Sequence, residues 1–395
     1  MTRARMWSPG WLAVALVALF AYFFPSLRPV YKYLGAYAEL LYAVYIASVV
    51  LFLIAVERLP RDGWPMRMFR SPLVAAVVVL AVFAIVTLLY PLADGLRDIG
   101  RGSDHDDCVI LGVRELFRAG FPYDVRTYIG NACSTGPGVF VLAAPFVAFG
   151  LYAYLNVVAL LLCLVVIRAR YGAVFAQTWL FVLVGMAIFV ELMAVGSDLI
   201  FLALLTLMIC VALDSPRVRG RIIPVAGLAV LCGLIAAARM NFLVIPLVIG
   251  ALAFAADRRM FVIFTALGTG VALALWVGFY AWDPDAFSPY QVVQRSRTLA
   301  PFWVLVAGGL ISMGLFFAAA VMVRRSPFGV PVFYLVSMLP MFLVVAVGEL
   351  GVREWDLRLW EGANFLAPLY PFAAFALAEL APGRAGRRSA GGISG

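Results

Sequence analysis

The sequence predicts an all-α fold: a polytopic transmembrane bundle of about 12 spans, with two surface helices in its first large outer loop. Of the 395 residues, 65% are hydrophobic and only 13% are charged, whereas a soluble domain is about half apolar and a quarter charged. A lipid bilayer can cover that much apolar surface, and one soluble core cannot. Two further observations support this class: long apolar runs recur along the chain, and arginines recur in the connections between them.

The predicted spans are apolar runs of about 16–22 residues, close to the length that crosses a bilayer. They lie near 9–25, 37–56, 72–92, 151–167, 173–190, 197–213, 222–238, 240–256, 260–282, 302–323, 328–347 and 364–381. A further stretch, Gly138–Gly150, is too short at ~1.5 Å per residue to cross a ~30 Å hydrocarbon core, and Pro145 interrupts it. It is predicted to be an interfacial or re-entrant helix.

Orientation follows from the arginines, because positive residues concentrate in cytoplasmic connections. With a cytoplasmic N-terminus, the groups that share the cytoplasmic side are Arg3/Arg5, Arg58/Arg61/Arg67/Arg70, Arg168/Arg170, Arg217/Arg219/Arg221, Arg258/Arg259, Arg324/Arg325 and Arg384/Arg387/Arg388. The sequence therefore predicts a multi-pass protein of the cell (inner or plasma) membrane, with both termini cytoplasmic. The same placement explains the net charge of +9 without a nucleic-acid partner.

Three regions are expected: an N-terminal two-span hairpin with its cytoplasmic loop (1–71), a transmembrane catalytic module (72–382) and a cytoplasmic polar tail (383–395). No cytoplasmic connection exceeds about 15 residues, and none resembles a phosphate-binding glycine loop after a strand. A cytoplasmic nucleotide-binding domain is therefore excluded, and any chemistry is expected on the outer face.

The large outer loop, residues 93–136, contains the first candidate site. Residues 104–119 have helical periodicity, and Gly120 and Pro122 are expected to end that helix. Its first turn contains Asp104, Asp106 and Asp107, with the only histidine of the chain, His105.

These acids have two interpretations. Ser103 could cap the helix with Asp106 at its third position, since acids in a first turn are favoured by the helix dipole. However, three acids within four residues repel one another. The functional interpretation is a general base with a neighbouring carboxylate that orients a substrate hydroxyl or helps to hold a divalent cation; Asp104, Asp106 and Asp107 would be the metal ligands. His105 by itself adds little.

Two of the five cysteines, Cys108 and Cys133, also lie in this loop. A disulfide between them would join the helix to the segment that returns to the membrane. Two cysteines in one loop can equally be a coincidence, and both interpretations stay open at this point. The other three cysteines lie inside predicted spans and are expected to be packing residues.

Other polar residues map to the same side. Ser197 and Asp198 open a span, either as caps or as part of a site. Arg239 and Asn241 lie at a tight turn between two spans. An arginine near the apolar core is costly unless it is paired or used; Arg239 would suit an anionic phosphate or could extend to the interface.

Two later outer loops add further charge: 283–301, with Arg295, and 348–363, with Arg353 and several acids. Acids and arginines from separate spans thus converge on one predicted side of the membrane. Such a constellation is typical of a site for a polar, phosphate-bearing ligand at a membrane surface.

In their order and common side, several motifs resemble bacterial membrane glycosyltransferases of the C-type fold (GT-C), especially the polyprenyl-phosphate-sugar-dependent mannosyltransferase-like family. The matching motifs over roughly 90–380 are Asp106-Asp107, Gly120-Phe-Pro-Tyr123-Asp124, the short helix from Gly136-Pro137 to Pro145, Gly196-Ser-Asp198 and Asn364-Phe-Leu-Ala-Pro-Leu-Tyr-Pro371. Two departures are an extra hairpin (9–56) and Ile110, where many relatives carry a tyrosine.

The resemblance implies two surface helices, about 105–119 and 137–149, and transfer of a hexose such as mannose from a polyprenyl-phosphate donor to a lipid or glycan acceptor. Asp106 best matches the family's catalytic aspartate, and Asp107 comes next. Arg239, with Arg295 or Arg353, would stabilise the departing lipid phosphate. The full set of implied substrate-binding residues is Asp104, His105, Tyr123, Asp198, Arg239, Asn241, Arg295 and Arg353.

Two other functions fit parts of the pattern. Twelve spans with both ends inside also describe many transporters or flippases, although these often have two related halves and their longest loop near mid-chain. A lipid-linked oligosaccharide polymerase or ligase would more often concentrate its polar residues in a late outer loop.

Overall fold

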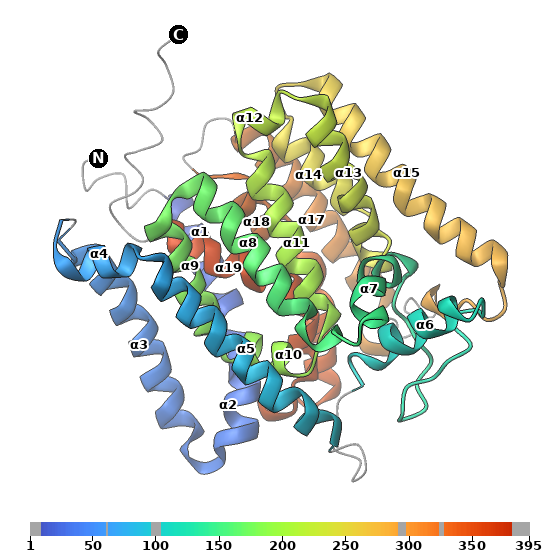
Figure 1. Ribbon diagram of the computed structural model, residues 1–395, viewed down its shortest axis with the longest axis horizontal. Coiled ribbons are helices and arrows are strands. Elements are labelled where there is room, and N and C mark those ends of the chain that lie inside the picture. Colours follow the sequence, from blue (N-terminus) through green and yellow to red (C-terminus); the bar gives the residue numbers. More distant parts are fainter. Residues whose placement is uncertain (1–8, 61, 96–103, 291–297, 324–327, 381–395) are drawn as a thin grey trace. The chain divides into compact units, whose positions relative to one another are not determined.

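The computed structural model describes residues 9–60, 62–95, 104–290, 298–323 and 328–380 (Figure 1). Over these ranges the chain is helical apart from turns, loops and one isolated β-bridge between Arg126 and Ala132. The predicted all-α class is therefore confirmed. The chain divides into two compact units.

The first unit comprises Met1–Leu80, Leu164–Glu191 and Trp303–Gly395, and the second comprises Ala81–Cys163 and Leu192–Phe302. Helices α5 (Pro72–Gly95), α8 (Leu155–Tyr171) and α10 (Ala187–Ala194) contribute to both units. The division at residues 71/72 and 382/383 stays a prediction.

The first unit is built around α19, whose residues are almost all buried. Its other helices are α1 (Pro9–Phe23), α2 (Leu27–Leu34), α3 (Ala38–Arg58), α4 (Trp64–Arg70), α9 (Ala173–Val184), α17 (Phe302–Met322), α18 (Val330–Val352), η8 (Leu357–Leu359) and η9 (Glu361–Leu369), which leads into α19 (Tyr370–Leu380). Helices α1, α9 and α18 pack on α19 (Figure 1). The Trp179 indole N–H of α9 donates to the Pro371 carbonyl over 3.1 Å, which satisfies a buried polar group inside this apolar core.

The predicted N-terminal hairpin forms part of this unit. Helix α1 continues through the short helix η2 (Phe24–Ser26) into α2, and the chain then turns at Gly35, whose φ of +53° favours glycine. Helix α3 returns beside α2.

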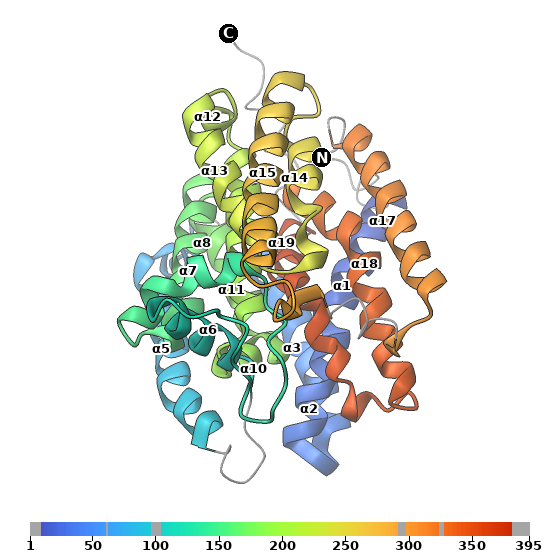
Figure 2. The same ribbon diagram turned by 90° about the vertical axis from the view of Figure 1, so that its right-hand side faces the viewer.

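The second unit contains the segment from the predicted outer loop. Its helices are α6 (Asp107–Phe117), α7 (Pro137–Ala148), α11 (Asp198–Leu213), α12 (Pro216–Arg219), α13 (Ile222–Ala236), α14 (Ile245–Ala253) and α15 (Arg258–Trp282). Helices α13 and α15 lie side by side in both views (Figures 1 and 2). They approach closely because Gly233 has no side chain: a β-carbon there would lie 2.5 Å from the Gly268 carbonyl oxygen. The two helices predicted at about 105–119 and 137–149 are α6 and α7.

By length and hydropathy this is a multi-pass membrane protein. In the part of the chain that the structure describes, seven helical segments are long and apolar enough to cross a membrane, or eight if α9 and α10, which meet at a 76° bend, form one span. One of the seven is the 49-residue stretch that contains the hairpin.

The structure thus shows fewer qualifying spans than the twelve apolar runs. The runs at 197–213, 222–238 and 240–256 form the shorter helices α11, α13 and Met240–Ala253. Turn residues such as Ala237 and Ala238 are apolar and therefore extend a run in the sequence without extending the helix. At ~1.5 Å per residue, the 16 residues of α11 cover about 24 Å.

Candidate functional site

Helix α6 begins later in the acidic segment than the sequence periodicity predicts. The helix begins at Asp107, so Asp106 is its N-cap residue and Asp104 precedes the helix. The prediction that all three aspartates belong to the first turn is therefore wrong. The turn at residues 105–106 separates them, and Ser103, the predicted cap, lies outside the described residues. At the C-terminal end of α6 the chain turns at Ala119, which has a φ of +60°. This is one residue before Gly120, the residue predicted to end the helix.

Asp106 does not use its carboxylate as a helix cap. The side chain makes no capping hydrogen bond to α6, is 1% exposed, and accepts a hydrogen bond from the Tyr90 hydroxyl of α5. A buried carboxylate needs hydrogen-bond donors, because desolvation of the charge is costly. The contact with Tyr90 of α5 therefore helps to position this side chain.

The other two acids of the segment hold the loop that follows α6. Asp107 Oδ2 accepts from the Tyr128 backbone N–H over 2.9 Å, and Asp104 Oδ2 accepts from Asn131 Nδ2 over 3.3 Å. Cys108 and Cys133 form a disulfide that joins α6 to the end of the same loop. In the described contacts, the three carboxylates therefore have different hydrogen-bond donors.

The predicted divalent-cation site does not fit this arrangement. Within the described ranges, no group of three or more His, Cys, Asp or Glu side chains is arranged to hold a metal ion. Among the described contacts, these three carboxylates accept from different donors, which are Tyr90, Tyr128 and Asn131.

A second acidic position lies where α10 leads into α11. Gly196, with φ of +66°, turns the chain after α10, and Ser197 occupies the N-cap of α11 without a capping hydrogen bond from its side chain. Two side chains hold this turn: the Tyr152 hydroxyl donates to the Gly196 carbonyl and Asn156 Nδ2 donates to the Ser197 carbonyl, each over 3.1 Å.

Asp198, the first residue of α11, forms a buried ion pair with Arg239. Both carboxylate oxygens accept from Arg239 Nη2, over 2.8 and 2.7 Å. The side chains are 1% and 21% exposed, respectively. A buried pair of this kind needs good geometry to offset desolvation of both charges. The predicted cap residue is therefore an ion-pair partner, and Arg239 is paired rather than extended freely to the interface.

Arg239 is positioned by the junction between α13 and α7. The Ala238 carbonyl accepts from the Gly136 N–H over 2.7 Å, and the Ala237 carbonyl accepts from the Gly138 N–H over 3.3 Å. A β-carbon at Gly138 would lie 1.9 Å from the Leu234 carbonyl oxygen. Only glycine fits at this position. The backbone N–H groups at the start of α7 therefore bond the last carbonyls of α13, directly before Arg239.

The two acidic positions are joined by tyrosines. A β-carbon at Gly196 would lie 2.7 Å from Tyr90 Cε2 and 3.3 Å from Tyr152 Cε1. Tyr90 thus bonds Asp106 and also touches the turn that precedes Asp198. The Tyr152 hydroxyl interacts electrostatically with residues of both acidic positions: Asp198, Asp106, Tyr90 and Arg239.

Tyr123 brings the loop after α6 into the same neighbourhood. Its ring packs against Phe140 and Phe287, at centroid distances of 5.5 and 5.1 Å. Burial raises the pKa of the Tyr123 hydroxyl well above its usual value, and the positive charge of Arg239 acts in the opposite direction. Tyr123 therefore stays protonated near neutral pH and is within electrostatic range of Arg239.

Several buried polar atoms of this unit lack a hydrogen-bond partner among the described residues. They include Tyr123 Oη, Thr135 Oγ1, Asn156 Oδ1, Ser197 Oγ and Arg239 Nε. Buried polar groups are rarely left unsatisfied in folded proteins. Asn156, Ser197 and Arg239 themselves form the contacts described above, which supports a polar ligand in the neighbourhood of Asp198 and Arg239.

Not every predicted residue joins this neighbourhood. Asn241 is exposed in the short helix η6 (Met240–Phe242), and His105 is half-buried in the turn before α6. Arg353 belongs to the other unit, where it pairs with Glu349 over 2.9 Å. Arg295 lies outside the described residues.

Sequence reasoning missed the tyrosines at Tyr90 and Tyr152 and the amide of Asn156. Each lies near the end of an apolar run, where a tyrosine is ordinarily explained as a membrane-interface residue. The signal that could have found them was their position beside predicted outer connections.

The chain gives no significant match to a known protein family, to a curated protein or to a solved structure. The fold defines the class, a multi-span helical membrane protein. The resemblance to GT-C enzymes therefore rests on the sequence motifs alone.

Proposed function

We propose that this protein is a membrane glycosyltransferase that moves a hexosyl group from a polyprenyl-phosphate donor to a hydroxyl of a lipid or glycan acceptor. The observation that carries the proposal is the buried Asp106 carboxylate, which accepts a hydrogen bond from Tyr90. The Tyr90 ring packs against the Gly196 turn, which leads directly to the Asp198–Arg239 pair. A carboxylate and an arginine close together can accept a proton and stabilise a leaving phosphate.

In the proposed reaction, Asp106 accepts the proton of the acceptor hydroxyl as its oxygen attacks the anomeric carbon. The bond between that carbon and the phosphate oxygen breaks, and its electron pair stays on the phosphate. A single displacement of this kind inverts the anomeric centre. Tyr90 fixes the orientation of the carboxylate by its hydrogen bond.

Arg239 would stabilise the departing lipid phosphate. Asp198 accepts hydrogen bonds from Arg239 Nη2 and so holds the guanidinium in place. The buried Nε of Arg239 has no partner among the described residues. A guanidinium presents five donors in a planar fork, so one carboxylate leaves donors for a phosphate oxygen. Tyr123, Thr135 and Ser197 offer further unsatisfied hydroxyls for the sugar.

The proposal includes a GT-C-like arrangement with twelve crossings, cytoplasmic termini and the site on the outer face. The short helix α11 would then cross largely within the protein. Nearly every residue of α11 is buried, so it needs no lipid-facing length of its own.

The test is an assay of purified protein with labelled polyprenyl-phosphate sugars and lipid acceptors. Asp106→Asn should abolish transfer, because an amide cannot accept the proton. Asp107→Asn is the matched neighbour: we expect it to weaken the loop at Tyr128 and to leave a reduced rate. Transfer by both variants at the wild-type rate would show that the catalytic assignment is wrong.

Transport is the second candidate, and a specific feature favours it. Helices α9 and α10 meet at a 76° bend, and Glu191 of α10 is 9% exposed. Broken helices and buried charges are typical of transporter binding sites. Substrate flux in liposomes, with no transfer from any lipid donor, would support this function instead.

A further inference from the structure

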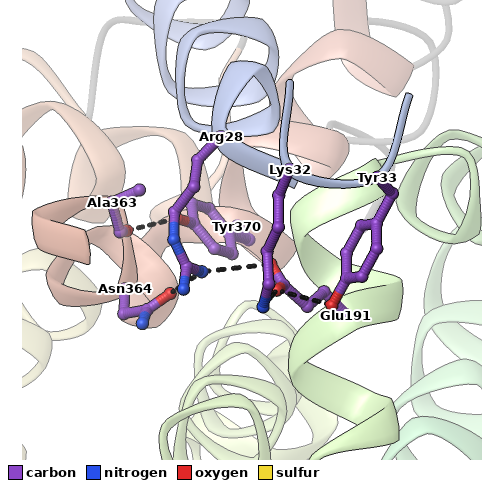
Figure 3. A network of polar contacts seen from close by, with 7 residues as sticks. All are labelled: Arg28, Lys32, Tyr33, Glu191, Ala363, Asn364 and Tyr370. Atoms are coloured by element: carbon purple, nitrogen blue, oxygen red, sulfur yellow. Dashed lines mark hydrogen bonds and ion pairs between the residues drawn. The ribbon is translucent and has the colours of Figure 1, made fainter. Parts of the chain in front are cut away.

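A cluster of charged side chains in the first unit has no role in the proposed reaction. Figure 3 shows Arg28, Lys32 and Tyr33 of α2 directed toward Glu191 of α10. Arg28 Nη1 lies 3.1 Å from Glu191 Oε2, whereas Lys32 Nζ and the Tyr33 hydroxyl lie 2.8 and 3.1 Å from Oε1. Arg28 also donates to Asn364 Oδ1 of η9 over 3.4 Å.

The charges in this cluster do not balance. Two cations share one carboxylate, and both oxygens of Glu191 are already engaged. The glutamate side chain is 6% exposed, whereas that of Lys32 is 47% exposed. The excess positive charge is therefore accessible at Lys32, whose ammonium has three donors.

The cluster lies at the tip of the N-terminal hairpin. Lys32 precedes the turn at Gly35 by three residues. The helical chain from Pro9 to Leu34 would be ~39 Å long at ~1.5 Å per residue, which exceeds the ~30 Å hydrocarbon core. The end of α2 therefore falls at headgroup level. Tyr33 and Tyr37, which are 62% and 71% exposed, are residues that favour this interface.

We propose that Arg28 and Lys32 bind the phosphate group of an anionic phospholipid from the surrounding bilayer. A phosphodiester would supply the missing negative charge and accept charge-assisted hydrogen bonds from both side chains. A third cation also lies beside α2, since the Arg358 guanidinium is 5.4 Å from the Tyr31 ring centroid. This lipid is bound and not consumed, so the inference does not depend on the proposed transferase activity.

Lys32 is the only lysine of the chain, which makes its acetylation a direct probe of the site. The full-length protein would be placed in nanodiscs of phosphatidylcholine alone or mixed with phosphatidylglycerol, and Lys32 acetylation would be followed by peptide mass spectrometry. We expect acetylation to be about tenfold slower with phosphatidylglycerol, since a charged hydrogen bond to the ammonium competes with the reagent. Arg28→Gln should remove most of this protection.

Three controls separate a phosphate site from general surface charge. Arg58→Gln removes one positive charge from an exposed position at the far end of α3 and should keep the protection. Discs made equally anionic with oleate should protect Lys32 less, and inorganic phosphate in neutral discs should not protect it. Equal protection by oleate, or protection by inorganic phosphate alone, would overturn the proposal.

Native mass spectrometry gives an independent measurement that needs no lysine chemistry. Wild type should retain phosphatidylglycerol in preference to phosphatidylcholine, Lys32→Arg should retain it, and Lys32→Gln should lose it. Lys32→Gln keeps the Arg28–Glu191 contact, so its fold should survive. Equal retention of phosphatidylglycerol by wild type and Lys32→Gln would also contradict the site.

Discussion

Gly196 lies directly against Tyr90: a β-carbon at residue 196 would come within 2.7 Å of the tyrosine ring. The hydroxyl of that same ring donates a hydrogen bond to Asp106. The turn between α10 and α11 therefore leaves space for the residue that orients the proposed base. A glycine is required at this turn for its backbone angle and for its lack of a side chain.

Gly196→Ala should displace Tyr90 and lower sugar transfer by about 10²-fold, the effect expected of a small misplacement at a reacting group. Gly150→Ala is the matched control, because Gly150 has a similar φ of +68° but nothing within 4 Å of the added β-carbon. Both variants should lose about 1 kcal/mol from backbone strain. Thermal unfolding and the transfer assay would be measured together. Equal activity of the two variants would contradict a role for this contact.

Tyr90→Phe removes the hydroxyl and keeps the ring that packs at the Gly196 turn. We expect kcat to fall by about tenfold or more, since Asp106 loses the donor that orients it, while the fold is kept. Tyr154→Phe is the control: its hydroxyl contacts Thr87 of the same α5 helix, at 3.4 Å, and not Asp106. A Tyr90→Phe enzyme with wild-type kcat would show that this hydrogen bond is not needed.

The Asp198–Arg239 pair can be tested by a double-mutant cycle. Arg239→Gln should cost about 3–5 kcal/mol, because it leaves a carboxylate that is 1% exposed without its counter-charge. Asp198→Asn should cost less, since Arg239 is partly exposed. The double variant should recover part of the stability and none of the transfer activity. If the double variant regained activity, the pair would be structural only.

The sequence predicted the helical class, the positions of most helices and the neighbourhood of Asp198 and Arg239. Long apolar runs indicate membrane helices, and a charge near such a run needs a partner or a function. The same runs did not predict which helices are long enough to span. Helix α13 ends at Ala236 although Ala237 and Ala238 are equally apolar, and only the contact of their carbonyls with Gly136 and Gly138 explains the end.

The side-chain contacts of the acidic segment also could not be predicted from the sequence. Periodicity placed a helix near residues 104–119, but it could not show that Asp106 faces Tyr90 while Asp107 faces Tyr128. Those directions depend on contacts with α5 and with the loop after α6, which are distant in sequence. The cluster around Glu191 was missed for the same reason, since Arg28 and Glu191 are 163 residues apart.

The disulfide between Cys108 and Cys133 should stabilise the fold around α6. It closes a loop with a sequence separation of 25 residues, for which chain entropy implies about 3–3.5 kcal/mol of stabilisation. Reduction, or Cys108→Ser, should lower the unfolding temperature and loosen the loop that Asp107 holds at Tyr128. Cys163, Cys210 and Cys232 are buried and should resist alkylation in the folded protein. Alkylation of both Cys108 and Cys133 without a reductant would exclude the disulfide, and with it the expectation that this loop faces an oxidising compartment.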